Sequence, residues 1–152
     1  MIRDASPADA TRLTDIALRS KAHWGYDDAF MAACRGELTV TPARLAAETT
    51  RVHEDGGAAD GFYSLSRASG EANVELFFVD PPAIGRGVGA ALWRDLVAQA
   101  ALDAVILRIE SDPQAEGFYR RMGAVRTGTA PSGSIPGRDL PLLIYDLRRG
   151  LQ

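Results

Sequence analysis

The amino-acid sequence predicts an α+β protein, in which helices cover both faces of a mixed, mostly antiparallel sheet of about six or seven strands. Three observations support this fold class. The chain has 152 residues, the length of one ordinary domain, and 46% of them are hydrophobic. Three strand-like segments with short turns follow one another mid-chain, which indicates an antiparallel meander. Helical and strand-like segments then alternate. We therefore expect residues 1–152 to form a single domain.

The first half of the chain is predicted to begin with helices and to continue as the meander. Ser6-Pro7 and Thr41-Pro42 each supply an N-cap residue and a proline for the first turn of a helix. Glycine-containing turns separate the later segments. The predicted elements are a strand from residue 2, a helix from residue 7, helices over 28–34 and 42–48, and strands over 50–54, 61–67 and 73–79.

The second half begins after Pro81-Pro82, which ends the meander. A glycine-rich segment then opens a helix whose apolar residues recur at four-residue spacing from Val88 to Ala100. Pro141 cannot donate a hydrogen bond, so we expect the last strand to have an edge position or an irregular start there. The remaining predicted elements are a strand over 104–109, a helix from Pro113 that Gly123 ends, and strands over 125–129 and 140–147.

Charge and composition argue against several classes of partner. Lys and Arg number 17 against 20 Asp and Glu, a net charge of −3, so no nucleic-acid partner is expected. The chain offers neither an apolar leader nor an apolar run of the length of a membrane span, so we expect no membrane partner. The single cysteine, Cys34, suits a reducing cytoplasm and is more typical of a small buried side chain than of a nucleophile. His23 and His53 are far apart and have no partner cysteine, so no metal is expected.

The most informative segment is the glycine loop Gly85-Arg86-Gly87-Val88-Gly89, between a strand and a helix. The first turn of a helix has free N–H groups and partial positive charge, and glycines let the backbone approach a ligand closely, so this arrangement favours a pyrophosphate. Ala90 follows where a Walker A loop needs Lys, which excludes that motif. The residues also match the dinucleotide-binding fingerprint Gly-x-Gly-x-x-Gly/Ala. That fingerprint follows the first strand of a βαβ unit, whereas the strand before this loop comes late in a meander. A turn that only lets helix and strand pack stays a further alternative.

Two blocks of this sequence resemble the GNAT superfamily of acyl-CoA-dependent N-acetyltransferases. The first combines Val79-Asp80-Pro81 with Gly87-Val88-Gly89, and it departs from the family at Ile84, where Arg or Gln is usual. The second runs from Asp112 to Gly123 and contains Phe118-Tyr119, with Asp112 in place of the usual Asn. The order of predicted elements is also similar to the family over nearly the whole chain.

The resemblance implies a three-layer GNAT-like fold and acetyl-CoA as cosubstrate, with no metal. The strand before the loop would hold the pantetheine through its backbone, and an N–H near Phe78 would polarise the thioester carbonyl. Arg86 would supply a cation in place of the residue missing at position 84. By carry-over, the cosubstrate would contact Phe77, Phe78, Val79, Ile84, Gly85, Arg86, Gly87, Val88, Gly89, Ala90, Asp112 and Tyr119.

The resemblance also implies catalytic roles for Tyr119 and Glu75. Tyr119 matches the family's usual general acid, since a phenol is protonated at neutral pH and can donate to a thiolate. Glu75 is the first candidate for the general base, His23 is its rival, and water is a further alternative. Weaker candidates are Cys34, Glu110 and His53.

Side chains alternate between the two faces of a strand. In the predicted strand over 73–79, Val74, Leu76 and Phe78 would therefore lie on one face and Glu75, Phe77 and Val79 on the other.

The acceptor amine, a small molecule or a peptide, is not specified by the sequence. Its pocket is predicted to use His23, Trp24 and Tyr26, with Arg138 available for an acceptor carboxylate. A homodimer is left open. Two other functions stay as alternatives to the N-acetyltransferase: a non-catalytic acyl-CoA-binding or regulatory module on the same fold, and a nucleotide-phosphate binder.

Overall fold

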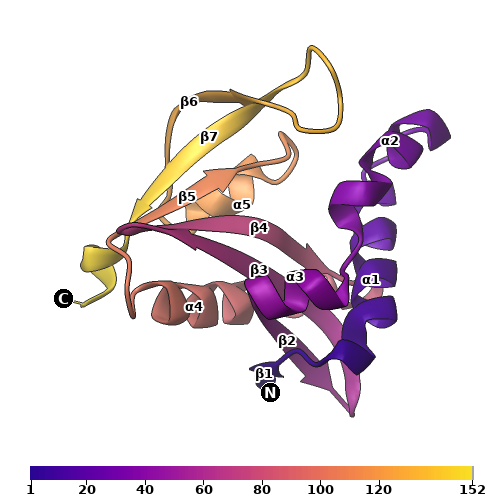
Figure 1. Ribbon diagram of the computed structural model, residues 1–152, viewed down its shortest axis with the longest axis horizontal. Coiled ribbons are helices and arrows are strands. Elements are labelled where there is room, and N and C mark those ends of the chain that lie inside the picture. Colours follow the sequence, from indigo (N-terminus) through magenta and orange to yellow (C-terminus); the bar gives the residue numbers. More distant parts are fainter. Residues whose placement is uncertain (152) are drawn as a thin grey trace.

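The computed structural model describes residues 1–151, with side chains to residue 149. Its seven-stranded sheet has the order β1-β2-β3-β4-β5-β7-β6, and every neighbouring pair is antiparallel except β4 with β5. The strands are β1 (Ile2–Asp4), β2 (Thr49–Asp55), β3 (Ala58–Ala68), β4 (Glu71–Val79), β5 (Ile106–Glu110), β6 (Val125–Pro131) and β7 (Asp139–Asp146). The predicted mixed, mostly antiparallel sheet is therefore confirmed (Figure 1).

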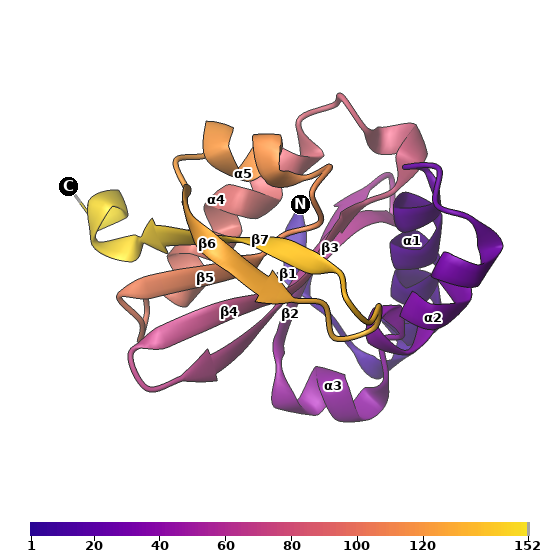
Figure 2. The same ribbon diagram turned by 90° about the horizontal axis from the view of Figure 1, so that it is seen from above.

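Helices cover both faces of the sheet. On one face, α1 (Ala10–Ala22), α2 (Asp28–Leu38) and α3 (Pro42–Ala47) surround a core that contains Leu13, Phe62 and Leu76. On the other face, α4 (Val88–Ala100) and α5 (Glu116–Arg121) cover a larger core that contains Tyr63 and Leu92. Figure 2 shows these two groups of helices on either side of the strands. No helix in the described part of the chain is long and apolar enough to span a membrane.

The predicted helix from residue 7 begins as a 3-10 turn, Pro7–Asp9, before α1 starts at Ala10. Asp9 accepts a hydrogen bond from the backbone N–H of Ser6 at 2.7 Å and forms an ion pair with Arg3 at 2.8 Å. This capping box turns the chain from β1 into the helix.

Two helices differ in length from the sequence prediction. Helix α2 runs four residues past Cys34 to Leu38, because Cys34 and Leu38 lie one turn apart and are both buried. Helix α5 starts at Glu116 rather than at Pro113. The carbonyl and the carboxylate of Asp112 accept hydrogen bonds from Ala115 N (2.9 Å) and Gln114 N (2.8 Å), which forms a turn before the helix.

Of the two alternatives predicted for the last strand at Pro141, an edge position or an irregular start, the structure contradicts the edge position. Strand β7 lies inside the sheet, between β5 and β6. The Pro141 carbonyl accepts a hydrogen bond from Ser111 N at 2.9 Å, just past the final β5–β7 pair, Glu110 with Leu142. The proline nitrogen faces the same side as its carbonyl, so the missing N–H falls beyond the end of β5 and costs no ladder bond.

Candidate active site

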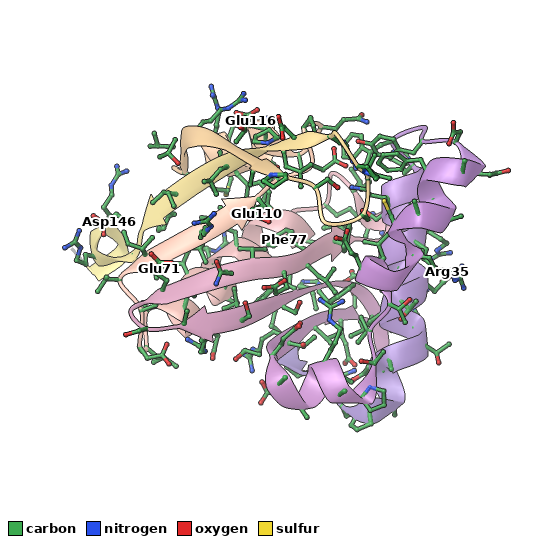
Figure 3. All side chains as sticks on the ribbon, turned by 45° about the horizontal axis from the view of Figure 1, so that its top comes forward. Arg35, Glu71, Phe77, Glu110, Glu116 and Asp146 are labelled. Atoms are coloured by element: carbon green, nitrogen blue, oxygen red, sulfur yellow. The ribbon has the colours of Figure 1, made fainter. Side chains whose placement is uncertain are left out.

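The sheet opens between β4 and β5, and this opening creates the main cavity. The two strands pair only over Glu71–Val74 with Ile106–Ile109, and then diverge towards α1 and α2 (Figure 1). The cavity has a volume of about 940 Å³, large enough for a cosubstrate and a small acceptor. Figure 3 labels Phe77 on β4 and Glu110 at the end of β5, the two strands that border the opening.

Beyond Val74, strand β4 has a hydrogen-bonding neighbour on one side only. Asp80 N donates to Asp60 O at 2.8 Å, across to β3. Hydrogen-bonded and non-hydrogen-bonded pairs alternate in an antiparallel ladder, so Phe78 also bonds to β3, opposite Phe62. The N–H and C=O groups of Phe77 and Val79 therefore face the opening. The expected carbonyl-polarising N–H near Phe78 would thus belong to one of its two neighbours.

The glycine loop opens into the same cavity. Gly85 (φ 85°) and Gly87 (φ 82°) have left-handed backbone conformations that favour glycine. Ala91 N donates to Gly87 O at 3.1 Å, so the preceding N–H groups of the first turn of α4 have no carbonyl within the helix. Of the residues predicted to contact the cosubstrate here, five line the cavity: Ile84, Gly85, Gly87, Gly89 and Ala90.

Two predicted members of the loop have other surroundings. The side chain of Val88 is 5% exposed and packs in the core under α4, so only its backbone can face a ligand. Arg86 is exposed, and neither residue is among the described residues that line the cavity.

Tyr119 lies on α5 with its ring in an aromatic cluster. Its ring centroid is 5.9 Å from those of Phe77 and Trp93 and 5.4 Å from that of Phe118. The residue is 6% exposed and forms part of the cavity wall. Burial, and to a smaller extent the negative charge of Asp112, raise the pKa of Tyr119 well above its usual value. The phenol therefore stays protonated throughout the neutral range.

The predicted alternation along β4 is wrong at Glu75. Ser64 pairs with Leu76 while Leu65 pairs with Val74, so Glu75 is an extra residue, a β-bulge. Val74 consequently packs with Phe77 and Val79 in the α4-side core, not with Leu76 and Phe78.

The bulge also changes where Glu75 points. Its carboxylate accepts a hydrogen bond from Ser66 Oγ at 2.5 Å. Since Ser66 follows Leu65, a residue of the α4-side core, it lies on the opposite face of the sheet. Glu75 is exposed and lines the cavity from that side rather than from the Phe77 side. Its role as base stays a prediction.

The predicted acceptor residues are only partly brought together at the cavity. Trp24, which is 42% exposed, and Arg138 both line it. The lining does not include His23 or Tyr26 within the described part of the chain, and His23 is exposed. Tyr26 lies behind the wall, where its hydroxyl accepts a hydrogen bond from Arg138 Nη2 at 2.9 Å.

Asp112 lies at the start of the β5–α5 turn, and the structure shows its carboxylate surrounded by donors. Lys21 Nζ contacts Oδ2 at 2.5 Å, and the Tyr26 hydroxyl lies 2.9 Å from both carboxylate oxygens. Burial works to raise the pKa of Asp112, but the hydrogen bonds from Lys21, Gln114 N and Tyr26 together lower it. Asp112 also lines the cavity, and the resemblance to the family implied that it contacts the pantetheine arm.

Sequence reasoning missed several residues of the cavity wall. Phe118, which stood only within a motif, packs against Phe77 with centroids 5.4 Å apart. Arg121, the last residue of α5, places a cation on the wall, and Lys21, the one lysine in the sequence, also lines the cavity. The uniqueness of Lys21 was the one available signal. Among the described residues no group of His, Cys, Asp or Glu side chains could hold a metal ion.

A comparison with known protein families identifies the family of this chain. The family model described as "Acetyltransferase (GNAT) domain" matches residues 30–132, more than half of the chain. The chain belongs to the GNAT acetyltransferase family. The predicted family, fold class and N-acetyltransferase type are therefore confirmed.

Solved GNAT structures share the fold at low sequence identity. A GCN5-related N-acetyltransferase from Rhodopseudomonas palustris has a TM-score of 0.81 and 24% identity, over 96% of this chain and 94% of that one. The PaiA N-acetyltransferase from Thermoplasma acidophilum, solved with coenzyme A, has a TM-score of 0.80 and 14% identity, over 96% and 98%. The putative acetyltransferase YncA from Salmonella typhimurium, solved with acetyl-CoA, has a TM-score of 0.68 and 22% identity, over 97% and 93%. No curated protein sequence matches this GNAT chain at a significant level.

Proposed function

We propose that this protein transfers the acetyl group of acetyl-CoA directly to the amine of a small-molecule or peptide acceptor. The observation that carries the proposal is the meeting of two features in one cavity. The unpaired edge of β4 and the open first turn of α4 both face the same space of about 940 Å³. A narrow polar backbone edge suits an extended pantetheine arm, and a helix N-terminus suits a pyrophosphate.

The loop has room for a pyrophosphate that larger residues would remove. A Cβ on Gly87 would meet no protein atom within 4 Å, so the space beside it is open to a ligand. A Cβ on Gly89 would lie 3.3 Å from the Phe118 ring, so a larger residue would press on the cavity wall. Ile84, the departure from the family pattern, is 48% exposed at the entrance. Because backbone N–H groups form this cradle, the loss of a side-chain cation at position 84 leaves it intact, and we assign Arg86 a supporting charge.

Different groups of this chain would carry out the separate parts of the acetyl transfer. Bound acetyl-CoA supplies an acetyl group activated as a thioester. The N–H groups of Phe77 and Val79 face the opening and would donate hydrogen bonds to the carbonyl oxygen as it gains negative charge. Tyr119 Oη holds its proton and would donate it towards the departing sulfur. Glu75, either directly or through water, would take the proton from the acceptor ammonium.

The acceptor would enter on the side lined by Trp24 and Arg138. Arg138 presents a guanidinium at the wall, which can form a charge-assisted hydrogen bond with an acceptor carboxylate. We retain His23 and Tyr26 as expected contributors through their segment, although neither is at the wall.

The test of this proposal compares ligands and then turnover. Acetyl-CoA should raise the melting temperature of the protein, while ATP and NAD should not. Free thiol should then form from acetyl-CoA with at least one amine of a panel that includes spermidine, L-lysine and a short peptide with a free N-terminus. Mass spectrometry should find that amine heavier by one acetyl group. Acetyl-CoA binding without amine-dependent thiol release would favour the non-catalytic binding module.

A further inference from the structure

A half-buried cluster connects three segments that are far apart in the sequence. It contains Lys21 and Tyr26 from the α1–α2 region, Phe30 from α2, Asp112 from the β5–α5 turn and Arg138 from the β6–β7 loop. The Lys21 and Asp112 side chains are only 13% and 12% exposed. Figure 2 shows the β6–β7 loop lying beside α2, as these contacts require. We call these five residues the Asp112 cluster.

The position occupied by Asp112 needs an acceptor-only side chain. Lys21 Nζ, the Tyr26 hydroxyl and the backbone N–H of Gln114 all donate to its two oxygens within 2.9 Å. Arg138 Nη2 adds positive charge 3.7 Å away. An amide at this position would turn an NH₂ group towards one of these donors, because only one of its two terminal atoms accepts. The departure from the family's usual Asn therefore has a local physical reason.

The cluster also fixes the orientation of Arg138. The Tyr26 and Phe30 rings stack with centroids 4.0 Å apart and an interplanar angle of 11°. The Arg138 guanidinium carbon lies 4.7 Å from the Phe30 centroid, while its Nη2 donates to the Tyr26 hydroxyl at 2.9 Å. Because burial raises the pKa of Tyr26, this hydroxyl stays protonated, and it donates a hydrogen bond to the Asp112 carboxylate. Asp112 thus holds Tyr26, and Tyr26 in turn holds Arg138 at the cavity wall.

We propose that Asp112 is a positioning residue of the acceptor side, which fixes Arg138 through Tyr26, and that it is not a ligand of the pantetheine arm. Its carboxylate is directed to Lys21 and Tyr26, side chains of the region that also supplies Trp24 to the wall. This inference rests on the proposed function, because it presupposes that the Trp24–Arg138 side receives the acceptor.

The first test needs no acceptor. Trp24 is 42% exposed whereas the other tryptophan, Trp93, is 4% exposed, so acrylamide quenching of fluorescence reports mainly on Trp24. In Asp112→Asn, quenching should increase, and amide hydrogen exchange should accelerate at least fivefold over residues 21–30 and 132–138. Asp103→Asn, a change at a 60%-exposed carboxylate in the α4–β5 loop, is the matched control and should change neither quantity. Unchanged quenching and exchange in Asp112→Asn would overturn the proposal.

The second test separates the two sides of the cavity. By calorimetry, Asp112→Asn should bind acetyl-CoA within threefold of the wild-type Kd. With the amine that the wild type acetylates fastest, its acceptor KM should rise at least tenfold, with a smaller change in kcat. A tenfold weaker Kd for acetyl-CoA with an unchanged acceptor KM would show a pantetheine ligand instead. A wild type that neither binds acetyl-CoA nor releases thiol would defeat the proposed function, whereas the quenching and exchange results would still report on the Asp112 cluster.

Tyr26→Phe covers the case in which Asp112→Asn does not fold. It keeps the stack on Phe30 and removes only the hydroxyl that links Asp112 to Arg138. Its acceptor KM should rise while its acetyl-CoA Kd stays unchanged. Where both variants fold, the double variant should lose no more than Asp112→Asn alone, because both changes break one chain of contacts. Additive losses, or an unchanged KM in Tyr26→Phe, would contradict the proposal.

Discussion

Replacement of Tyr119 by Phe should separate catalysis from stability. The change removes one hydroxyl and leaves the ring against Phe77, Trp93 and Phe118. Within the part of the chain that the structure describes, the Tyr119 hydroxyl has no hydrogen-bond partner, and burial raises its pKa. Its loss should therefore change the free energy of unfolding by about 0.5 kcal/mol or less. If the phenol protonates the departing sulfur, the single-turnover rate should fall about 100-fold, or about 2.7 kcal/mol in the barrier.

Tyr63→Phe is the matched control, with the opposite expected signature. Tyr63 is fully buried, and its hydroxyl donates to Asp95 Oδ2 at 2.6 Å. Asp95 keeps its two hydrogen bonds from Arg51, at 3.0 and 3.1 Å, so the loss should cost about 1–2 kcal/mol of stability. For a chain of this size that corresponds to a fall in Tm of roughly 2–8 °C. The single-turnover rate should stay at the wild-type value.

The assay pairs single-turnover acetyl transfer with thermal denaturation and calorimetry of acetyl-CoA. Single turnover is needed because slow product release would hide a change in the chemical step. Wild-type single-turnover rates in Tyr119→Phe would refute the role of the tyrosine as an acid and leave it a residue of the core.

Three further outcomes are expected. Gly87→Ala should cost about 1–2 kcal/mol of stability, because φ is 82°, and should weaken acetyl-CoA binding at least tenfold by calorimetry; Gly36→Ala in α2, also with nothing near its new Cβ, should leave the affinity unchanged. Hydrogen bonds from Arg3 lower the pKa of Asp9 to about 2, so a stabilisation on the order of 1–2 kcal/mol should be present above pH 4 and lost as pH falls towards 2. Urea titrations should show that loss in the wild type and not in Asp9→Asn. Glu75→Gln should lower kcat/KM and move its acidic limb without changing acetyl-CoA affinity, and a wild-type pH profile would transfer the role to another group or to water.

The sequence predicted those parts of the fold that depend on neighbouring residues. The helix from Val88 followed from four-residue spacing and from the glycines that precede it. The meander followed from three strand-like segments with glycine-containing turns between them, and β2, β3 and β4 pair in that order. Such features are encoded within windows of a dozen residues, where periodicity and turn chemistry act.

The parts that sequence reasoning missed depend on distant partners. Asp112 is satisfied by Lys21, which lies 91 residues earlier, and no local pattern announces that pair. The insertion of β7 between β5 and β6 is likewise a choice of tertiary packing. In the candidate site, Gly85, Gly87, Gly89 and Tyr119 line the cavity, whereas His23 is exposed and is not among the described residues that line it.

The bulge at Glu75 produces the opening between β4 and β5. Val74 is the last residue of β4 that pairs with β5, and the very next residue is the one that β3 leaves unmatched. A bulge bends its strand and increases its twist, so β4 swings away from β5 from this residue onward. Every further pair would have lengthened the ladder by about 3.3 Å and used the Phe77 and Val79 backbone groups internally. Because of this one additional residue, β4 and β5 pair at one end only and the sheet is open between them beyond Val74. The length of β4 after the bulge then sets the depth of this opening.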